Sequence, residues 1–195
     1  MTTIGVLALQ GDFEEHAKML KIIRSKVEYV RLPEQLDLVD GLIIPGGEST
    51  TIVQLMSIYG FTDIIKRSII GGMPVWGTCA GMIVLSKELT EDNPKPLGLI
   101  DIRVKRNAFG RQVDSFETDV AVPVLGTNLF RAIFIRAPAI SAIGTGVTSL
   151  CELEEHGVIA ARQNNVLVTS FHPELTDDYR FHEYFVDMVT GQVAL

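Results

Sequence analysis

The predicted fold rests on residues 73–87, MPVWGTCAGMIVLSK. An apolar run leads into Gly77-Thr78-Cys79-Ala80-Gly81, and a second apolar run follows up to Lys87. The chain carries no charge from residue 68 to residue 86, but Pro74 and four glycines in that stretch would break a membrane-spanning helix. We therefore predict a strand, a sharp turn and a short helix, an arrangement typical of a parallel α/β sheet.

Short apolar runs alternate with amphipathic ones on the amino-terminal side of this segment. They predict strands at residues 4–9, 27–32 and 41–44, a helix capped by Asp12, and a helix over residues 50–59. The second half predicts a closing helix over 179–189 and shorter strands at 100–105, 116–122, 133–136, 147–153, 158–162 and 166–171. The predicted fold is α/β: a doubly wound, mostly parallel, flavodoxin-like sheet with helices on both faces and additional antiparallel strands in the second half. We expect one domain over residues 1–195.

The amino-acid composition and net charge exclude several classes of function. The chain has 195 residues, 47% of them hydrophobic, which is enough apolar content to bury a sizeable core. A formal charge of −7 repels nucleic acid and anionic lipid, so neither is an expected partner. The two cysteines cannot form a disulfide framework, and no signal peptide is recognised, so we expect a cytoplasmic protein. We interpret Cys151 as a core residue.

Cys79 is the candidate nucleophile. The glycines on either side of it permit a sharp turn that lifts the side chain out of the sheet, as in a nucleophile elbow. The start of a helix favours the thiolate form of a cysteine. The alternative is an inert, buried cysteine.

A nucleophilic cysteine needs a base, and the chain offers four histidines. His172 ends the predicted strand over 166–171, and Pro173 fixes the backbone before Glu174, whose carboxylate can turn back to the imidazole. These residues predict a Cys–His–Glu relay, and the alternative is a histidine that ends an edge strand beside an exposed glutamate. The other histidines are predicted to lie on solvated faces: His16, His156 and His182.

Pro45-Gly46-Gly47 follows a predicted buried strand. Two consecutive glycines free the backbone to point N–H groups at a developing negative oxygen, although an ordinary turn uses the same residues. Because parallel strands end at one edge of a sheet, we expect this loop to lie near Cys79. Phosphate binding is the rival interpretation, but no Gly-rich phosphate-binding motif follows any strand.

Together the Cys79 elbow, His172-Pro173-Glu174 and Pro45-Gly46-Gly47 resemble the class I (triad-type) glutamine amidotransferases. More narrowly, the glutaminase subunits of pyridoxal 5′-phosphate synthases are similar to this chain at residues 9–11, 46–51, 106–112, 134–138 and 170–176. The resemblance spans essentially the whole chain.

The resemblance implies that Cys79 attacks the side-chain amide of glutamine, forms a glutamyl thioester and releases ammonia, and that water then hydrolyses the thioester. His172 would shuttle the protons and Glu174 would orient it. By the same resemblance, oxyanion donors lie near Gly47 and Ala80. It also implies a set of glutamine-binding residues: Gly47, Glu48, Ser49, Arg106, Ile135 and Arg136. The remaining nearby cations, Arg103 and Lys105, are interpreted as a solvated basic face.

The resemblance further implies a partner, a barrel-fold synthase subunit that uses the ammonia to make pyridoxal 5′-phosphate. No nucleotide, metal or bound cofactor is expected on this chain. We expect the partner to contact Gln10 and the segment over 12–16, with Asp12, Glu15 and His16 as candidates. Two alternatives remain: a cysteine-elbow hydrolase or stress protein of the DJ-1/PfpI type, and a non-catalytic binding subunit.

Overall fold

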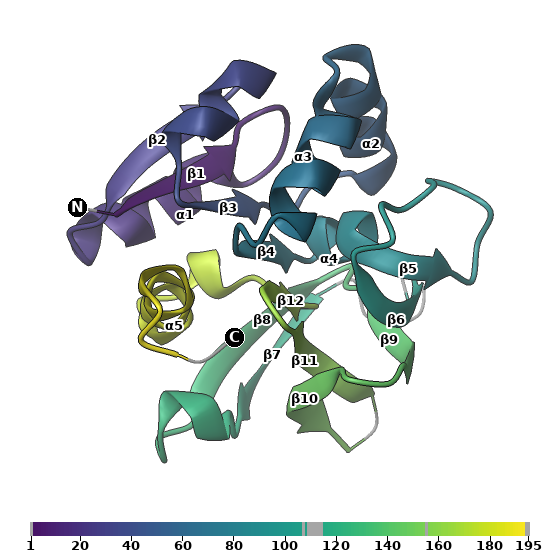
Figure 1. Ribbon diagram of the computed structural model, residues 1–195. Coiled ribbons are helices and arrows are strands. Elements are labelled where there is room, and N and C mark those ends of the chain that lie inside the picture. The colour runs from purple at the N-terminus through teal and green to yellow at the C-terminus, as the bar shows by residue number, and fades with distance from the viewer. Residues whose placement is uncertain (1, 107, 109–114, 155, 194–195) are drawn as a thin grey trace.

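The computed structural model describes residues 2–106, 108, 115–154 and 156–193 (Figure 1). Within them, the central sheet has seven strands in the order β10-β11-β12-β4-β3-β1-β2. The neighbours from β12 to β2 pair in parallel, whereas β10 and β11 are antiparallel additions. The strands are β1 (Thr3–Leu7), β2 (Lys26–Val30), β3 (Gly41–Ile44), β4 (Val75–Thr78), β10 (Thr148–Leu153), β11 (Gly157–Gln163) and β12 (Val166–Thr169).

Each central strand contributes side chains to two cores, one on either face of the sheet. Leu42 and Ile44 of β3 belong to one core and Ile43 to the other, as the period of two along a strand requires. The side chains of β3 are apolar toward both cores. Strands that are buried on both faces in this way appear in the sequence as continuous apolar runs.

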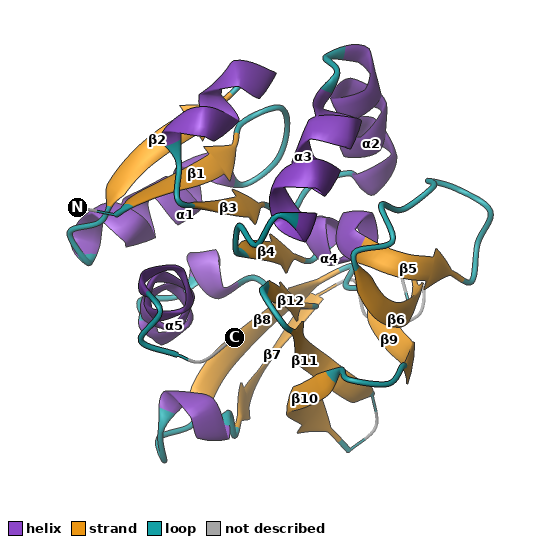
Figure 2. Ribbon diagram, in the orientation of Figure 1, coloured by secondary structure: helices purple, strands orange, loops and turns teal. Residues whose placement is uncertain are grey.

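Helices cover both faces of the sheet (Figure 2). The first core contains side chains from α2 (Ser49–Ile58), α3 (Phe61–Ile70) and α4 (Ala80–Leu85). The second contains side chains from α1 (Phe13–Ile22) and α5 (Arg180–Thr190) and from the hairpin of β7 (Ser115–Val120) and β8 (Phe130–Ile135). A three-stranded sheet is formed by β5 (Ser86–Leu89), β6 (Ile100–Lys105) and β9 (Ala139–Ile143). Three 3-10 turns complete the described elements: η1 (Pro33–Leu38), η2 (Pro123–Leu125) and η3 (Pro173–Leu175).

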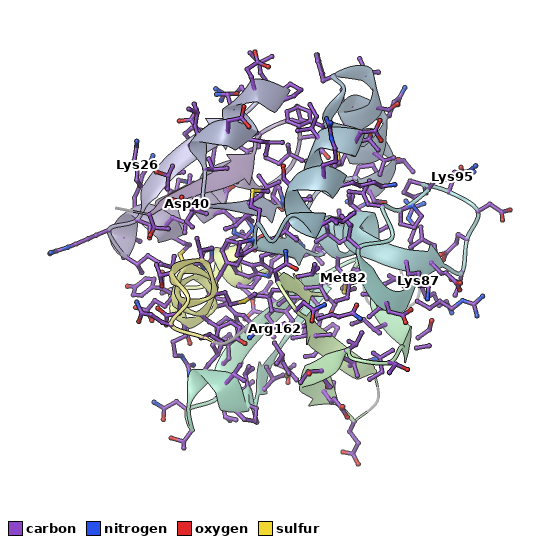
Figure 3. All side chains as sticks on the ribbon, viewed as in Figure 1. Lys26, Asp40, Met82, Lys87, Lys95 and Arg162 are labelled. Carbon is purple, nitrogen blue, oxygen red and sulfur yellow. The ribbon has the colours of Figure 1, made fainter. Side chains whose placement is uncertain are left out.

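This architecture confirms the predicted fold class. The parallel order β2-β1-β3-β4-β12 is the flavodoxin-like order, and the second half adds the expected antiparallel pairs. Among the described residues, no helix combines the length and apolar character needed to cross a membrane. Figure 3 places Met82 of α4 in the interior and Lys26, Lys87 and Lys95 at the periphery.

Some elements differ from the prediction. No element was assigned to residues 61–70, which form α3 because Phe61, Ile65 and Ile69 recur every four residues and pack in the core. The helix after the elbow ends at Leu85 rather than near Lys87, and Ser86 begins β5 while its hydroxyl donates to the carbonyl of Ile83 at 2.9 Å. Strand β9 was not predicted either.

Candidate active site

Cys79 lies between the end of β4 and the start of α4, in the sharp turn that the glycines predicted. Its φ of +47° lies in the region that L-residues rarely adopt, and 7% of its surface is exposed. Gly81 is required by close packing, because a Cβ there would overlap the carbonyl oxygen of Ile44 and lie 2.9 Å from the carbonyl carbon. The turn is therefore fixed directly against β3.

His172 follows β12, and η3 turns the chain so that Glu174 reaches back to it. Nδ1 of His172 lies 2.7 Å from Oε1 of Glu174, and each residue is 4% exposed. The backbone N–H of His172 donates to the carbonyl of Ile133 at 2.9 Å, which anchors the segment to β8. The predicted His–Glu pair is thus present and buried.

The imidazole of His172 faces the thiol of Cys79 as well as the carboxylate. Burial alone would lower the pKa of His172, but its interactions with Cys79 and Glu174 outweigh burial and raise the pKa to about 11. Burial raises the pKa of Glu174, although the hydrogen bond from His172 opposes that shift. His172 thus interacts with both Cys79 and Glu174, an arrangement suited to a nucleophile, a base and an orienting carboxylate.

The glycine loop after β3 packs directly on this line. A Cβ at Gly46 would lie 2.5 Å from Cε1 of His172, so the ring rests against bare backbone. The N–H of Gly46 donates to Oγ1 of Thr78 at 3.0 Å. On the other side, the N–H of Asp12 donates to the carbonyl of Gly46 at 3.1 Å, and Oε1 of Gln10 accepts from the N–H of Glu48 at 2.8 Å. The loop is held from both sides.

A cavity of about 330 Å³ opens in front of Cys79 and His172. All six residues proposed to bind glutamine line it: Gly47, Glu48, Ser49, Arg106, Ile135 and Arg136. Ala80 lines it too, as do Ile83, Pro138 and Leu175, which the sequence analysis did not single out. One wall of the cavity carries an ion pair, in which a guanidinium nitrogen of Arg106 lies 3.0 Å from Oε1 of Glu48.

Asp12 corrects one sequence prediction. It occupies the position before α1, but its side chain does not cap the helix. Instead its Oδ2 lies 3.5 Å from Nδ1 of His172, and the residue lines the cavity. Among the described residues, Asp12, His172 and Glu174 have potential metal-ligand atoms within 4.8 Å of one another, but Nδ1 of His172 is already hydrogen-bonded to Glu174.

The expectation that His16 and His182 lie on solvated faces is wrong. Both are fully buried, on the faces that α1 and α5 turn to the sheet. His16 therefore cannot contact a partner directly, which also corrects its place among the candidates. The apolar stripe of α1 through Phe13, Ala17 and Leu20 was the signal available, since position 16 lies on that stripe.

The other predicted residues are placed as follows. Glu15 is on α1, with a side chain 35% exposed, and its carboxylate lies 3.7 Å from Lys18. Arg103 and Lys105 are exposed on β6, as expected. Cys151 is buried, and burial raises the pKa of its thiol to about 11. His156 is half-buried rather than solvated and lies against Phe116, with ring centroids 5.7 Å apart. In the similarity segment 106–112, residues 107 and 109–112 lie outside the described residues.

The family model described as the SNO glutamine amidotransferase family matches residues 6–191. The chain belongs to this family. A relative from Herpetosiphon aurantiacus named pyridoxal 5′-phosphate synthase subunit PdxT is 54% identical over 189 residues, covering 95% of this chain and all of that protein. A protein of the same name from Fervidobacterium nodosum is 54% identical over 187 residues and covers 95% of this chain and 96% of its own.

Solved structures agree with this membership. A crystal structure described as a glutamine amidotransferase superposes with a TM-score of 0.90 at 45% identity, over 96% of this chain and 98% of the other. As a member of the SNO glutamine amidotransferase family, the chain is an enzyme, and the DJ-1/PfpI and non-catalytic alternatives are not favoured.

Proposed function

We propose that this chain is the glutaminase subunit of a pyridoxal 5′-phosphate synthase and acts as one domain over residues 1–195. It hydrolyses L-glutamine to L-glutamate and ammonia. The observation that carries the proposal is that Cys79 and His172 interact at a charged cavity, while the buried Glu174 holds His172 from behind. The names of relatives that are 54% identical over nearly the whole chain support the assignment to this synthase.

The reaction follows from these groups. His172 takes the proton of the Cys79 thiol, the sulfur attacks the side-chain amide carbon of glutamine, and the C–N bond breaks as His172 gives that proton to the leaving nitrogen. Ammonia departs and a glutamyl thioester remains. His172 then takes a proton from a water molecule whose oxygen attacks the thioester. The C–S bond breaks, glutamate leaves, and His172 returns the proton to the sulfur. Glu174 keeps Nδ1 of His172 engaged throughout, which leaves Nε2 for the reacting atoms.

The cavity wall matches the free amino acid end of the substrate. Glutamine carries an ammonium and a carboxylate on its α-carbon, and Arg106 and Glu48 present one cation and one anion side by side. A guanidinium can bind a carboxylate with two parallel hydrogen bonds. Ser49, Ile135 and Arg136 line the same space, which agrees with their proposed role in holding glutamine.

Stabilisation of the tetrahedral intermediate is assigned to backbone N–H groups near Gly47 and Ala80. Ala80 is the first residue of α4, so its N–H has no acceptor within the helix. The carbonyl oxygen that becomes negative can lie between this N–H and the glycine loop, because both lie at the cavity that contains Cys79.

The proposed partner is a barrel-fold synthase subunit, and the setting that we propose is the cytoplasm. Gln10 and Asp12 line the cavity and hold the glycine loop, and Glu15 is partly exposed on the adjacent helix. A subunit that contacts this rim would therefore act on the loop beside Cys79. Gln10→Ala tests this: glutaminase turnover is measured with and without the synthase subunit, and an unchanged stimulation contradicts the proposed contact.

Labelling with a diazo ketone analogue of glutamine tests the function. The chain, with the synthase subunit present, is incubated with the analogue and the adduct is located by mass spectrometry. We expect modification of Cys79, its loss in Cys79→Ser, and protection by excess glutamine. Cys151→Ser is the matched control and should leave labelling unchanged, because Cys151 is buried away from the cavity. Absence of a Cys79 adduct contradicts the proposed function.

A further inference from the structure

Behind Glu174 lies a chain of buried polar groups to which the proposed mechanism gives no role. Nδ1 of His16 lies 3.0 Å from Nε2 of His182, and Nε2 of His16 lies 3.1 Å from Oγ1 of Thr78. The same Nε2 lies 3.4 Å from Oε2 of Glu174. His16 from α1 therefore bridges α5, the end of β4 and the carboxylate that holds His172.

The second carboxylate oxygen of Glu174, Oε2, needs a nearby positive charge or N–H group. Among the side chains of the described residues, only His16 provides one. Oε1 accepts from His172, but Oε2 is buried and has no hydrogen-bond partner. Leaving a buried carboxylate oxygen without a donor is costly. The other titratable groups that face Glu174 are His172 and Asp12, and Asp12 opposes its ionisation.

The proton on His16 can sit on either ring nitrogen, and its surroundings favour one of them. Burial and neighbouring imidazoles lower the pKa of His16 well below its usual value, and burial lowers that of His182 to about 3, so both rings are neutral. A proton on Nε2 lets this N–H donate to Thr78 and places its positive end 3.4 Å from Oε2 of Glu174, as an electrostatic contact rather than a hydrogen bond. A proton on Nδ1 would instead turn a lone pair toward the carboxylate and force His182 to bury an unpaired N–H at Nδ1.

We propose that His16 is a positioning residue: its Nε2–H supports Oε2 of Glu174 and holds the carboxylate in its ionised form and in register with His172, while His182 fixes the tautomer of His16. The inference rests on the proposed glutaminase function. The same ring is connected to the glycine loop through Thr78, because Oγ1 of Thr78 contacts Nε2 of His16 and accepts the N–H of Gly46. His16 thereby links the orienting carboxylate to the loop that faces the reacting carbonyl.

Substitutions at His16 separate a donor role from mere packing. His16→Phe keeps a ring but removes both nitrogens, whereas His16→Gln keeps an amide N–H near the position of Nε2. We expect His16→Phe to lower kcat for glutamine by about 10- to 100-fold, as loss of an outer hydrogen-bond partner does in metal sites, with KM changed less than about twofold. His16→Gln should recover kcat to within about threefold of the parent chain.

The pH profile gives a second readout. Loss of the Nε2–H removes a group that favours the charged form of Glu174, so the pKa of Glu174 rises further. The acid limb of kcat/KM should then move to higher pH in His16→Phe and return in His16→Gln. Phe185→Leu is the matched control: Phe185 of α5 packs against Trp76, which contacts both histidines, and it offers no polar atom, so the acid limb should not move.

Nitrogen NMR of the ¹⁵N-histidine-labelled chain tests the tautomer without any substitution or any activity. We expect the proton of His16 on Nε2, and a proton on Nδ1 overturns the inference. An unshifted acid limb with full kcat in folded His16→Phe also overturns it, as does a folded His16→Gln that remains as impaired as His16→Phe. If the parent chain shows no glutaminase activity with the synthase subunit, the proposed function fails, while the NMR result still decides the role of His16.

Discussion

Replacing His182 with phenylalanine should flatten the pH dependence of stability in a calculable way. In the folded chain, burial lowers the pKa of His182 to about 3, against about 6.5 for an unfolded histidine. As the pH falls below about 6.5, His182 binds a proton in the unfolded chain but stays neutral in the folded chain. The stability present above that pH is therefore lost progressively toward pH 3. At about 1.4 kcal/mol per pH unit, the loss from this one group between about pH 7.5 and pH 5 is about 2 kcal/mol.

Urea unfolding of the parent chain and His182→Phe at the two pH values measures this quantity. The unfolding free energy of the parent chain minus that of His182→Phe should fall by about 2 kcal/mol on going to about pH 5. Only the parent chain has a histidine at position 182 that must stay neutral in order to fold. Titrating groups that do not interact with His182 or His16 cancel in the difference, and burial, the largest cause of the lowered pKa of His16, acts on that ring in both proteins. Phe185→Leu should show a pH-independent difference. A pH-independent difference for His182→Phe as well would refute the reasoning.

Three further outcomes are expected. Glu174→Gln should lower kcat by about 10²- to 10⁴-fold with little change in KM, since the amide no longer holds the productive histidine tautomer; single-turnover kinetics with glutamine checks this, and a loss below tenfold contradicts it. Gly81→Ala should destabilise the chain by about 3 kcal/mol or more, because the new Cβ meets the carbonyl of Ile44, and an unchanged urea midpoint contradicts this packing. Arg106→Lys should raise KM for glutamine about tenfold while kcat stays within about twofold, because the bidentate fork is lost; an unchanged KM removes this residue from the binding site.

The sequence was sufficient to predict that Cys79, His172 and Glu174 come together, because its signals are local. Flanking glycines mark the turn at Cys79, and the spacing of Pro173 and Glu174 after His172 allows the carboxylate to fold back. The position of the glycine loop near Cys79 then followed from the general rule that parallel strands end at one edge of a sheet.

The buried histidines could not be found in the same way. A histidine on an amphipathic helix is compatible with either the solvated or the buried face, and the contact of His16 with His182 joins residues 166 positions apart. Asp12 shows the same limit: its position predicted a helix cap, but tertiary packing placed its carboxylate near His172 instead. Such pairings depend on how α1 and α5 seat on the sheet, which local patterns do not encode.

The chain contains one tryptophan, Trp76, and it sits in the middle of the sheet beside both buried imidazoles. Its ring centroid lies 5.5 Å from that of His16 and 5.0 Å from that of His182, each edge to face. Intrinsic tryptophan fluorescence therefore arises from a single indole in direct contact with the imidazoles behind the carboxylate of Glu174. Any ligand or subunit that shifts those rings changes the emission of an unlabelled, unaltered chain, so the fold supplies its own optical reporter.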